Sequence, residues 1–230
     1  MSVPEASGKR STREPEAIDA QLLVIAKEPV PGRVKTRLTP PFTPAEAARL
    51  AEAALTDTLA AVASTPVARR VLALAGRPGD WLPAGFDVIP QRGDGLDERL
   101  AAAFDETHAG LPLPMVLIGM DTPQVTPGLL GHAAGTLVRG DADAVFGPAA
   151  DGGFWLLGLR RPDPSLLVGV PMSRADTGRR QLDRLTAAEL RVAMMPELTD
   201  VDTVTEAELV ASQIPGSAFA TAFGSALVRA

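Results

Sequence analysis

Short apolar runs alternate along the chain with longer segments in which apolar residues recur at helical spacing. A short apolar run bounded by polar or turn-forming residues is typical of a buried strand, and the longer pattern is typical of an amphipathic helix. Strands are predicted for QLLVIA at 21–26, RVLALA at 70–75, FDVIP at 86–90, PMVLIGM at 114–120, DADAVFG at 141–147, GGFWLLGL at 152–159 and RVAMM at 191–195. This alternation predicts an α/β domain with a mostly parallel central sheet and helices on both faces.

Threonines mark three of the predicted helix starts. Thr43 precedes Pro44 and stands three residues before Glu46, which is the spacing of a capping box with proline in the first helical position. Thr126 likewise precedes a proline, and Thr203 has a glutamate three residues later. Helices are therefore predicted to begin after these threonines, and the first is predicted to end near residue 64. Two more helices are predicted at 94–108 and 174–188.

The composition narrows the class of protein. Of the 230 residues, 46% are hydrophobic and 22% are charged, and the net charge is −6, so nucleic acid is not expected as a partner. The chain has no cysteine, which excludes disulfides, thiolate metal sites, iron–sulfur clusters and a cysteine nucleophile. No segment resembles a membrane span or a secretory signal. A cytoplasmic protein is expected, and its oligomeric state is left open.

The limits of the folded part are also predicted from composition. Residues 1–20 are polar and charged and are predicted to form a disordered tail. Residues 21–214 are predicted to form a single α/β domain, which is long enough to bury a large core. Residues 215–230 are small and polar, and the sequence leaves their structure open.

A basic loop, KEPVPGRVKTRLTP, follows the first predicted strand. Its cations are Lys27, Arg33, Lys35 and Arg37, and Gly32 shapes the turn among them. Ligands of open parallel sheets collect beyond the carboxyl ends of the strands, so this loop is predicted to bind nucleotide phosphates. A solvated basic loop is the alternative. The loop lacks the GxxxxGK[ST] and GxGxxG patterns, so neither a typical ATPase loop nor a dinucleotide fingerprint is expected.

Carboxylates at two other places are candidate metal ligands. Asp121 directly follows the apolar strand at 114–119, and the hard divalent cation that accompanies a diphosphate prefers carboxylate oxygens. Asp202 is the second candidate, and Asp200 would face the same side as Asp202 in an extended segment. The alternatives are that Asp121 only caps the turn before Pro123, and that one of the later aspartates only caps the following helix.

Two further loops carry candidate residues. Asp151 lies in a glycine-rich turn with Gly152 and Gly153, and it is a candidate for orienting or deprotonating an acceptor hydroxyl. A plain hairpin turn would use the same residues. The loop after the third strand offers, as candidates for contacting the nucleobase, Gln91, Gly93 and Asp94. A capped helix start explains the last of these equally well.

The chain resembles a bacterial family of small glycosyltransferase-like proteins with the glycosyltransferase-A fold. The resemblance covers about residues 21–210 and lies in the segments KEPVPGRVKTRL, GDGLDERL, GMDTPQ, GPAADGGFWLLGL and DVDT. That family is similar in fold to the molybdenum-cofactor and phospholactate guanylyltransferases. The resemblance implies a nucleotide-diphospho-sugar transferase fold that uses Mg²⁺ or Mn²⁺.

The resemblance also implies roles for individual residues. Lys35 and Arg37 would contact phosphates, Asp121 would match the family's metal-binding aspartate, and Asp202 would match a second carboxylate beside the metal. Phe154 and Met172 stand where a tyrosine and a tryptophan are expected, on the acceptor side. The acceptor is therefore the part of the reaction that the resemblance defines least.

Three hypotheses about function follow. The first is a metal-dependent glycosyltransferase with a nucleotide-sugar donor and a small-molecule acceptor, with Asp151, Lys35 and Arg37 as catalytic residues. The second is a nucleotidyltransferase, for example a guanylyltransferase, that joins an NTP to a phosphorylated small molecule and releases pyrophosphate. The third is a nucleotide-binding protein without catalytic activity.

Overall fold

The structure is a computed structural model that describes residues 17–228. The predicted tail therefore lies outside the described residues up to residue 16. Beyond that point the predicted boundary is wrong, because strand β1 already begins at Ile18. Ile18 packs against the core, Ala20 is fully buried, and the backbone N–H of Ile18 donates to Pro66 O. These contacts extend the strand three residues ahead of the predicted start at Gln21.

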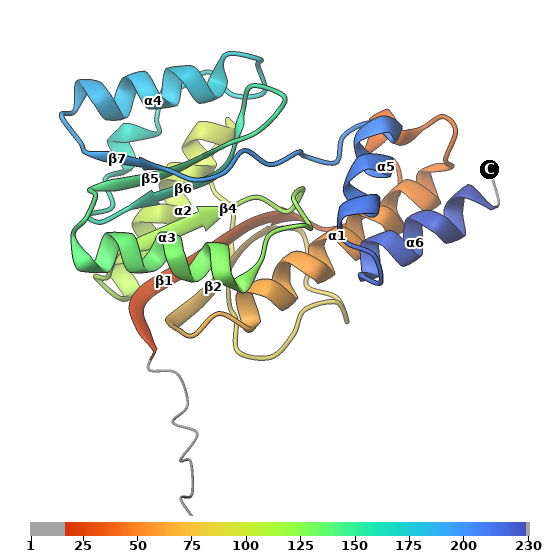
Figure 1. Ribbon diagram of the computed structural model, residues 1–230, viewed down its shortest axis with the longest axis horizontal. Coiled ribbons are helices and arrows are strands. Elements are labelled where there is room, and N and C mark those ends of the chain that lie inside the picture. The colour runs from red at the N-terminus through yellow and green to blue at the C-terminus, as the bar shows by residue number, and fades with distance from the viewer. Residues whose placement is uncertain (1–16, 229–230) are drawn as a thin grey trace, which may run out of the picture.

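Strands and helices alternate as the apolar pattern predicts (Figure 1). The strands are β1 Ile18–Lys27, β2 Val67–Ala75, β3 Asp87–Pro90, β4 Met115–Ile118, β5 Ala144–Pro148, β6 Phe154–Leu159 and β7 Val192–Met194. The helices are α1 Pro44–Ala63, α2 Leu96–Gly110, α3 Pro127–Arg139, α4 Thr177–Ala187, α5 Val204–Gln213 and α6 Ala218–Leu227, with short 3-10 helices η1 Thr36–Leu38 and η2 Pro164–Leu166.

The predicted starts are confirmed for three helices, and two other helices begin later in the chain than predicted. Thr43, Thr126 and Thr203 each accept a hydrogen bond from the third residue of the helix that follows, as their spacing predicts. Helix α2 begins at Leu96 rather than Asp94, because the carboxylate of Glu98 accepts the free backbone N–H groups of residues 94 and 95. Helix α4 begins at Thr177 rather than at residue 174, since the preceding residues form a loop.

The central sheet has seven strands in the order β3-β2-β1-β4-β6-β5-β7 within the described residues. All neighbouring strands run parallel except β6, which is antiparallel to both β4 and β5. The prediction of an α/β fold with a mostly parallel sheet is confirmed. A two-glycine turn rather than a helix connects β5 to β6, and a short connection of this kind can join only antiparallel neighbours.

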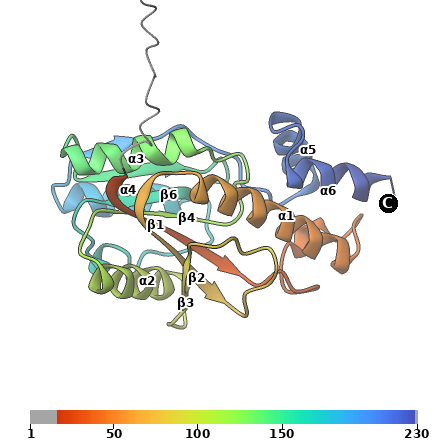
Figure 2. The same cartoon turned by 90° about the horizontal axis from the view of Figure 1, so that it is seen from below.

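Helices cover both faces of the sheet, so the strands are buried on both sides. Residues Leu22 and Val24 of β1 face the layer that holds α1 and α3. Leu23, which alternates with them, faces the layer that holds α2, η2 and α4. Figure 2 shows α1 and α3 on one side of the sheet and α2 on the other. This two-sided burial explains why the strands read as continuous apolar runs.

A third apolar cluster lies at one end of the molecule, where α5 and α6 pack beside α1 (Figure 1). Phe42, Phe219 and Phe223 form its centre, with Phe42 edge-on to Phe223. The segment left open at 215–230 therefore continues the domain through α6. Its pattern was hard to read because α6 is built mainly from alanine and other small residues around its two phenylalanines.

In the part of the chain that the structure describes, no helix combines the length and the apolar character that crossing a membrane requires.

The start of α6 depends on a carboxylate from α1. Asp57 accepts hydrogen bonds from the backbone N–H groups of Ala218, at 3.0 Å, and Phe219, at 2.8 Å. We expect Asp57→Ala to lower the free energy of unfolding by about 1 kcal/mol, because two N–H groups at a helix start lose a charged acceptor. Urea denaturation measures this change. Asp105→Ala, at an exposed position of α2, is the control and should stay within about 0.5 kcal/mol of the wild type.

Candidate functional site

A cleft of about 820 Å³ opens at the edge of the sheet where the parallel strands end. Strands β1, β2, β3 and β4 finish at this edge, and the antiparallel strand β6 begins there, since Ile118 of β4 pairs with Leu156 of β6. The polar and charged residues that line the cleft are Lys27, Arg33, Lys35, Thr36, Arg37, Gln91, Arg99, Asp121, Thr122, Asp151, Ser173, Arg174, Thr177, Asp200 and Asp202. The cleft therefore lies where ligands of open parallel sheets collect.

The basic loop after β1 enters the cleft at Lys35. Its neighbours Val34 and Leu38 are buried in two different apolar clusters, and they anchor the loop on either side of the lysine. Lys35 itself adopts a left-handed backbone conformation, with φ 48° and ψ 39°, before η1 begins. Residues other than glycine adopt this conformation at a cost. The anchoring of the loop holds Lys35 in it, and the Lys35 side chain is only 5% exposed.

The ammonium of Lys35 lies between two carboxylates from distant parts of the chain. Its Nζ forms ion pairs with Asp121 Oδ1 and, at 3.2 Å, with Asp202 Oδ1. Burial by itself opposes the charge of Lys35, but the attraction of Asp121 and Asp202, with a hydrogen bond to each, outweighs it and raises the pKa of Lys35. Arg37 lies outside this group: its Nη1 is 3.6 Å from Asp202 Oδ2, and its side chain is 74% exposed.

The chain after β7 carries two aspartates into the cleft. It first runs beside β5, where Leu198 N–H donates to Pro148 O, and then crosses to β4, where Val201 N–H donates to Asp121 O. Val201 is fully buried in the third apolar cluster. Asp200 and Asp202, on either side of it, both line the cleft, as the alternation of an extended segment predicts.

These contacts test the alternative that the aspartates only cap a turn or a helix. The side chain of Asp121 pairs with Lys35, and no backbone N–H of its own turn donates to it among the described residues. Helix α5 is capped by Thr203 together with Glu206, which also accepts from the backbone N–H of Asp202. Neither later aspartate therefore caps that helix.

Asp200 is the most buried carboxylate of the cleft. Its Oδ1 is buried and has no hydrogen-bond partner. Burial raises the pKa of Asp200 to about 7, the negative charges of Asp121 and Asp151 add to this rise, and Lys35 opposes it. An acid that titrates near neutral pH in a cleft indicates a functional region.

The glycine-rich turn between β5 and β6 brings Asp151 to the cleft. Asp151 is exposed, and its Oδ1 accepts a hydrogen bond from Gly153 N–H at 2.8 Å. Gly152 has φ +88°, and a side chain there would collide with the backbone oxygen of Ala175. The glycines therefore allow the turn to pack against the loop before α4. The carboxylate takes part in the turn and also lines the cleft.

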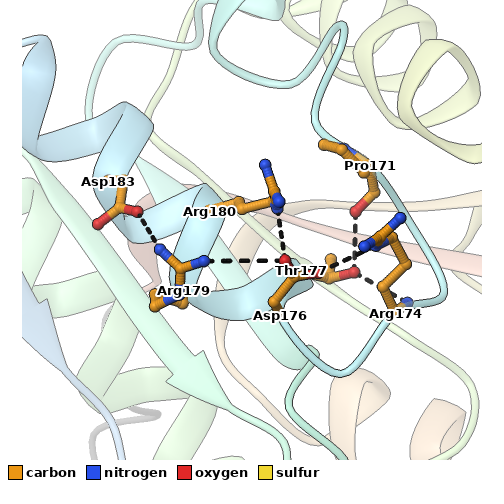
Figure 3. Close-up of polar contacts among 7 residues, drawn as sticks. All are labelled: Pro171, Arg174, Asp176, Thr177, Arg179, Arg180 and Asp183. Atoms are coloured by element: carbon orange, nitrogen blue, oxygen red, sulfur yellow. Dashed lines mark hydrogen bonds and ion pairs between the residues drawn. The ribbon is translucent and has the colours of Figure 1, made fainter.

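The loop before α4 lines the cleft beside the Asp151 turn, and ion pairs hold this loop in shape (Figure 3). The carboxylate of Asp176 accepts hydrogen bonds from Arg180 Nε, at 2.7 Å, and Arg174 Nε, at 3.1 Å. These hydrogen bonds, that of Arg180 first, lower the pKa of Asp176. Thr177 Oγ1 donates to Pro171 O and accepts from Arg174 N–H. This network fixes the place of Arg174 at the rim.

The predicted nucleobase residues are only partly placed at the cleft. Gln91 lines it, but its amide Nε2 donates to the backbone oxygens of Ala26 and Ala73, so it also ties the strand ends together. Gly32, Gly93 and Asp94 are not among the lining residues. Gly32 and Gly93 have positive φ, which fits a role in shaping their turns. Direct nucleotide contact by these three residues stays a prediction without support from the geometry.

Two arginines of the cleft were not predicted from the sequence, and Asp200 was given little weight there. Arg99 follows the 91–95 loop by one helical turn, and its guanidinium donates to the backbone oxygens of Gly93 and Asp94. Arg174 lies in the loop before α4, which was predicted as helix. Arg99 follows a polar loop at the carboxyl edge of the sheet, and that position is the signal that could have identified it. No such signal marks Arg174, because the preceding strand β6 ends at the opposite edge.

The carboxylates are suited to a divalent ion that arrives with phosphate oxygens. Among residues 17–228, no group of three or more histidine, aspartate or glutamate side chains is arranged to hold a metal ion. Mg²⁺, however, usually binds one or two carboxylates together with substrate phosphates and water. Asp121 and Asp202 already share one cation, Lys35, and Asp200 has an unpartnered oxygen beside them. The residues present therefore fit the metal ion that the fold implies.

Comparisons with known proteins agree with the fold. A family model described as "Uncharacterized protein conserved in bacteria (DUF2064)" matches residues 50–174. A crystal structure from Desulfovibrio desulfuricans G20, of a protein provisionally named a nucleotide-diphospho-sugar transferase, is 28% identical with a TM-score of 0.80. The alignment covers 91% of this chain and 94% of that one. The predicted resemblance to bacterial proteins of the nucleotide-diphospho-sugar transferase fold is confirmed.

More distant structures share the fold alone. Rv0371c from Mycobacterium tuberculosis H37Rv, crystallised as a manganese complex, is 20% identical over 84% of this chain and 98% of that one, with a TM-score of 0.51. The 2-C-methyl-D-erythritol 4-phosphate cytidylyltransferase from Thermus thermophilus is 17% identical over 90% and 98%, also with a TM-score of 0.51. No curated protein matches the sequence. The structural neighbours named for an activity are transferases.

The burial of Asp200 generates a prediction about pH. Its pKa is about 7 when folded against 3.8 for the free side chain, so the unfolded chain releases this proton first as the pH rises. The wild type therefore loses stability from about pH 4 to about pH 7. Asp200→Asn cannot ionise, and we expect its melting temperature in EDTA to exceed that of the wild type by more at pH 8 than at pH 5. Equal differences at the two pH values would contradict the assignment, and Asp105→Asn is the matched control.

Proposed function

We propose that this chain, which belongs to the bacterial family DUF2064, is a metal-dependent glycosyltransferase that uses a nucleotide-sugar donor. The observation that carries the proposal is the ion-pair group of Asp121, Lys35 and Asp202 at the carboxyl edge of the sheet. The two carboxylates are suited to a divalent metal ion, and the lysine ammonium is suited to the diphosphate that the metal accompanies. The provisional name of the Desulfovibrio protein supports this choice of donor.

The donor diphosphate would lie against the loop after β1. Lys35 and Arg37 would contact its oxygens, and Lys27 and Arg33, which also line the cleft, would add positive charge. Asp121 and Asp202 would hold the metal ion. The diphosphate would therefore lie between the cations of this loop and the metal ion held by the two aspartates.

The chemistry is displacement at the anomeric carbon of the sugar. The acceptor oxygen would form a bond to that carbon as the bond to the diphosphate breaks, and the nucleoside diphosphate would leave with the bonding electrons. Mg²⁺ or Mn²⁺, when bound, would neutralise the negative charge that develops on the diphosphate. Lys35 and Arg37 would stabilise the same charge through hydrogen bonds.

The acceptor would enter from the side of Asp151. The carboxylate of Asp151 would orient the acceptor hydroxyl or take its proton. Phe154 and Met172 line this side of the cleft, with Arg174 at the rim. The apolar side chains favour an acceptor with an apolar part, and the guanidinium favours one with a polar or anionic group.

A nucleotidyltransferase is the second candidate. The cytidylyltransferase from Thermus thermophilus shares the fold, and the four cations of the loop at residues 27–37 suit a triphosphate. In that reaction the phosphate oxygen of the acceptor would attack the α-phosphorus of an NTP, and pyrophosphate would leave. The same carboxylates and the same lysine would serve, so the identity of the released product separates the two candidates.

A thermal-shift screen tests the proposal. Nucleotide sugars, nucleoside diphosphates and NTPs are added with and without Mn²⁺, and at 100 times Kd a ligand is expected to raise the melting temperature by about 5–10 °C. Asp121→Asn should abolish the part of the shift that depends on Mn²⁺, while Asp105→Asn should retain it. If no nucleotide stabilises the wild type, the proposal is wrong.

The donor that the screen identifies is then incubated with candidate acceptors and Mn²⁺. Release of a nucleoside diphosphate from a sugar nucleotide is the result expected of a glycosyltransferase. Release of pyrophosphate from an NTP would replace it with the second candidate. Binding that Asp121→Asn leaves unchanged, without turnover of any donor, would indicate a nucleotide-binding protein without catalytic activity.

A further inference from the structure

The place between Asp121 and Asp202 already holds a positive charge. Both carboxylates contact the same atom, Lys35 Nζ, and each is more than one third exposed while the lysine is almost fully buried. The lysine therefore fills the inner side of the pair and leaves the carboxylates open toward the cleft. A metal ion bound by the two aspartates would have to share them with this ammonium.

We infer that Lys35 is the counter-ion of the Asp121–Asp202 pair when no metal is bound. When a divalent metal ion binds to the two aspartates, the Lys35 ammonium moves to a phosphate of the donor. The cleft then takes up the metal together with a diphosphate and binds the metal alone only weakly. This inference rests on the proposed function and adds to it the form of the substrate, a metal–diphosphate complex.

The position of Lys35 makes it an effective competitor. Its ammonium is 5% exposed, so without the two carboxylates it would be a buried and unpaired charge, which is strongly unfavourable. A metal ion that arrived alone would take these carboxylates for its own coordination and would add a repulsive positive charge beside the ammonium. Both effects oppose the binding of the metal alone.

A diphosphate removes this conflict. Its oxygens give Lys35 a new anionic partner and complete the coordination of the metal, which in proteins commonly includes substrate phosphates. Lys35 needs to turn only its side chain, because Val34 and Leu38 anchor the backbone on either side. The metal and the diphosphate should therefore strengthen the binding of each other.

The other cations of the loop are not buried between the two carboxylates. Arg37 lies 3.6 Å from Asp202 and is 74% exposed, so water can solvate its charge when the carboxylate turns away. Arg33 also lines the cleft and forms no ion pair among the described residues. Arg33→Met is therefore a matched control for Lys35→Met: each removes one positive charge from the same loop, but only the second frees the carboxylate pair.

The test is a titration with Mn²⁺, followed by the electron paramagnetic resonance signal of the free ion, with and without a nucleoside diphosphate, and corrected for the Mn²⁺ that the diphosphate binds in the absence of protein. UDP, GDP and CDP are each used as the diphosphate. For the wild type, Mn²⁺ alone should bind weakly, and at least one diphosphate should tighten its binding by about tenfold or more. Lys35→Met should bind Mn²⁺ alone about tenfold more tightly than the wild type, yet bind the diphosphate more weakly.

Arg33→Met should leave the affinity for Mn²⁺ alone near that of the wild type. Lys35→Met/Asp121→Asn should lose the tight Mn²⁺ binding, which assigns the bound ion to the carboxylate pair. Lys35→Arg, which keeps the charge, should keep the weak binding of Mn²⁺ alone. Lys35→Gln, which also removes the charge, replaces Lys35→Met if that variant does not fold. The stimulation by the diphosphate is measured on the wild type and does not depend on any variant.

Failure of the inference differs from failure of the proposed function. If the wild type binds Mn²⁺ alone as tightly as Lys35→Met, or if Lys35→Met binds it more weakly, Lys35 is not a competing counter-ion, while the proposed metal-dependent transfer is unaffected. If neither protein binds Mn²⁺ with or without any diphosphate, the inference and the proposed metal dependence are both wrong.

Discussion

The cleft depends on one interaction, the ion pairs that Lys35 forms with Asp121 and Asp202. They join the loop after β1, the turn after β4 and the segment after β7, which are far apart in the sequence. An almost fully buried ammonium requires opposite charges, and two adjacent carboxylates require a cation. The three side chains therefore stabilise one another at the edge of the sheet where the proposed metal and diphosphate would bind.

The sheet that brings these segments together follows from the sequence to a large extent. Strands buried on both faces are read from continuous apolar runs, and Thr43, Thr126 and Thr203 mark three helix starts through their caps. The place of β6 in the sheet is less evident, because the Asp151 turn shows a short connection to β5 but not that β6 also pairs with β4. The start of α4 was missed because Thr177 closes a local turn, through hydrogen bonds with Arg174 N–H and Pro171 O, that the helical spacing of the apolar residues does not reveal.

The candidate site was predictable in its position and less so in its contacts. Because parallel strands end at a common edge, Asp121 and the basic loop were expected to meet there, and alternation placed Asp200 and Asp202 on one side. No pattern in the sequence indicated that Lys35 would occupy the space between two aspartates, since the contact with Asp202 spans 167 positions. The burial of Asp200 was equally hidden, because the packing that buries it is tertiary.

The two sides of the cleft carry different kinds of side chain. The turn at Gly152 packs directly on Ala175, so the side of Asp151 and the loop before α4 form one surface. That surface brings Phe154, Met172 and Arg174 to the cleft, whereas the four cations at residues 27–37 come from the loop after β1. The division fits the proposed donor held by the loop cations and a proposed acceptor held by the apolar side chains together with the Arg174 guanidinium.

The most direct test is a crystal structure with Mn²⁺ and the nucleoside diphosphate that stabilises the protein, with the metal located by anomalous scattering. We expect an anomalous peak about 2.0–2.2 Å from carboxylate oxygens of Asp121 and Asp202, and Lys35 Nζ within hydrogen-bonding distance of a phosphate oxygen. A metal bound elsewhere in the cleft, with Lys35 still between the two aspartates, would contradict the role assigned to this group.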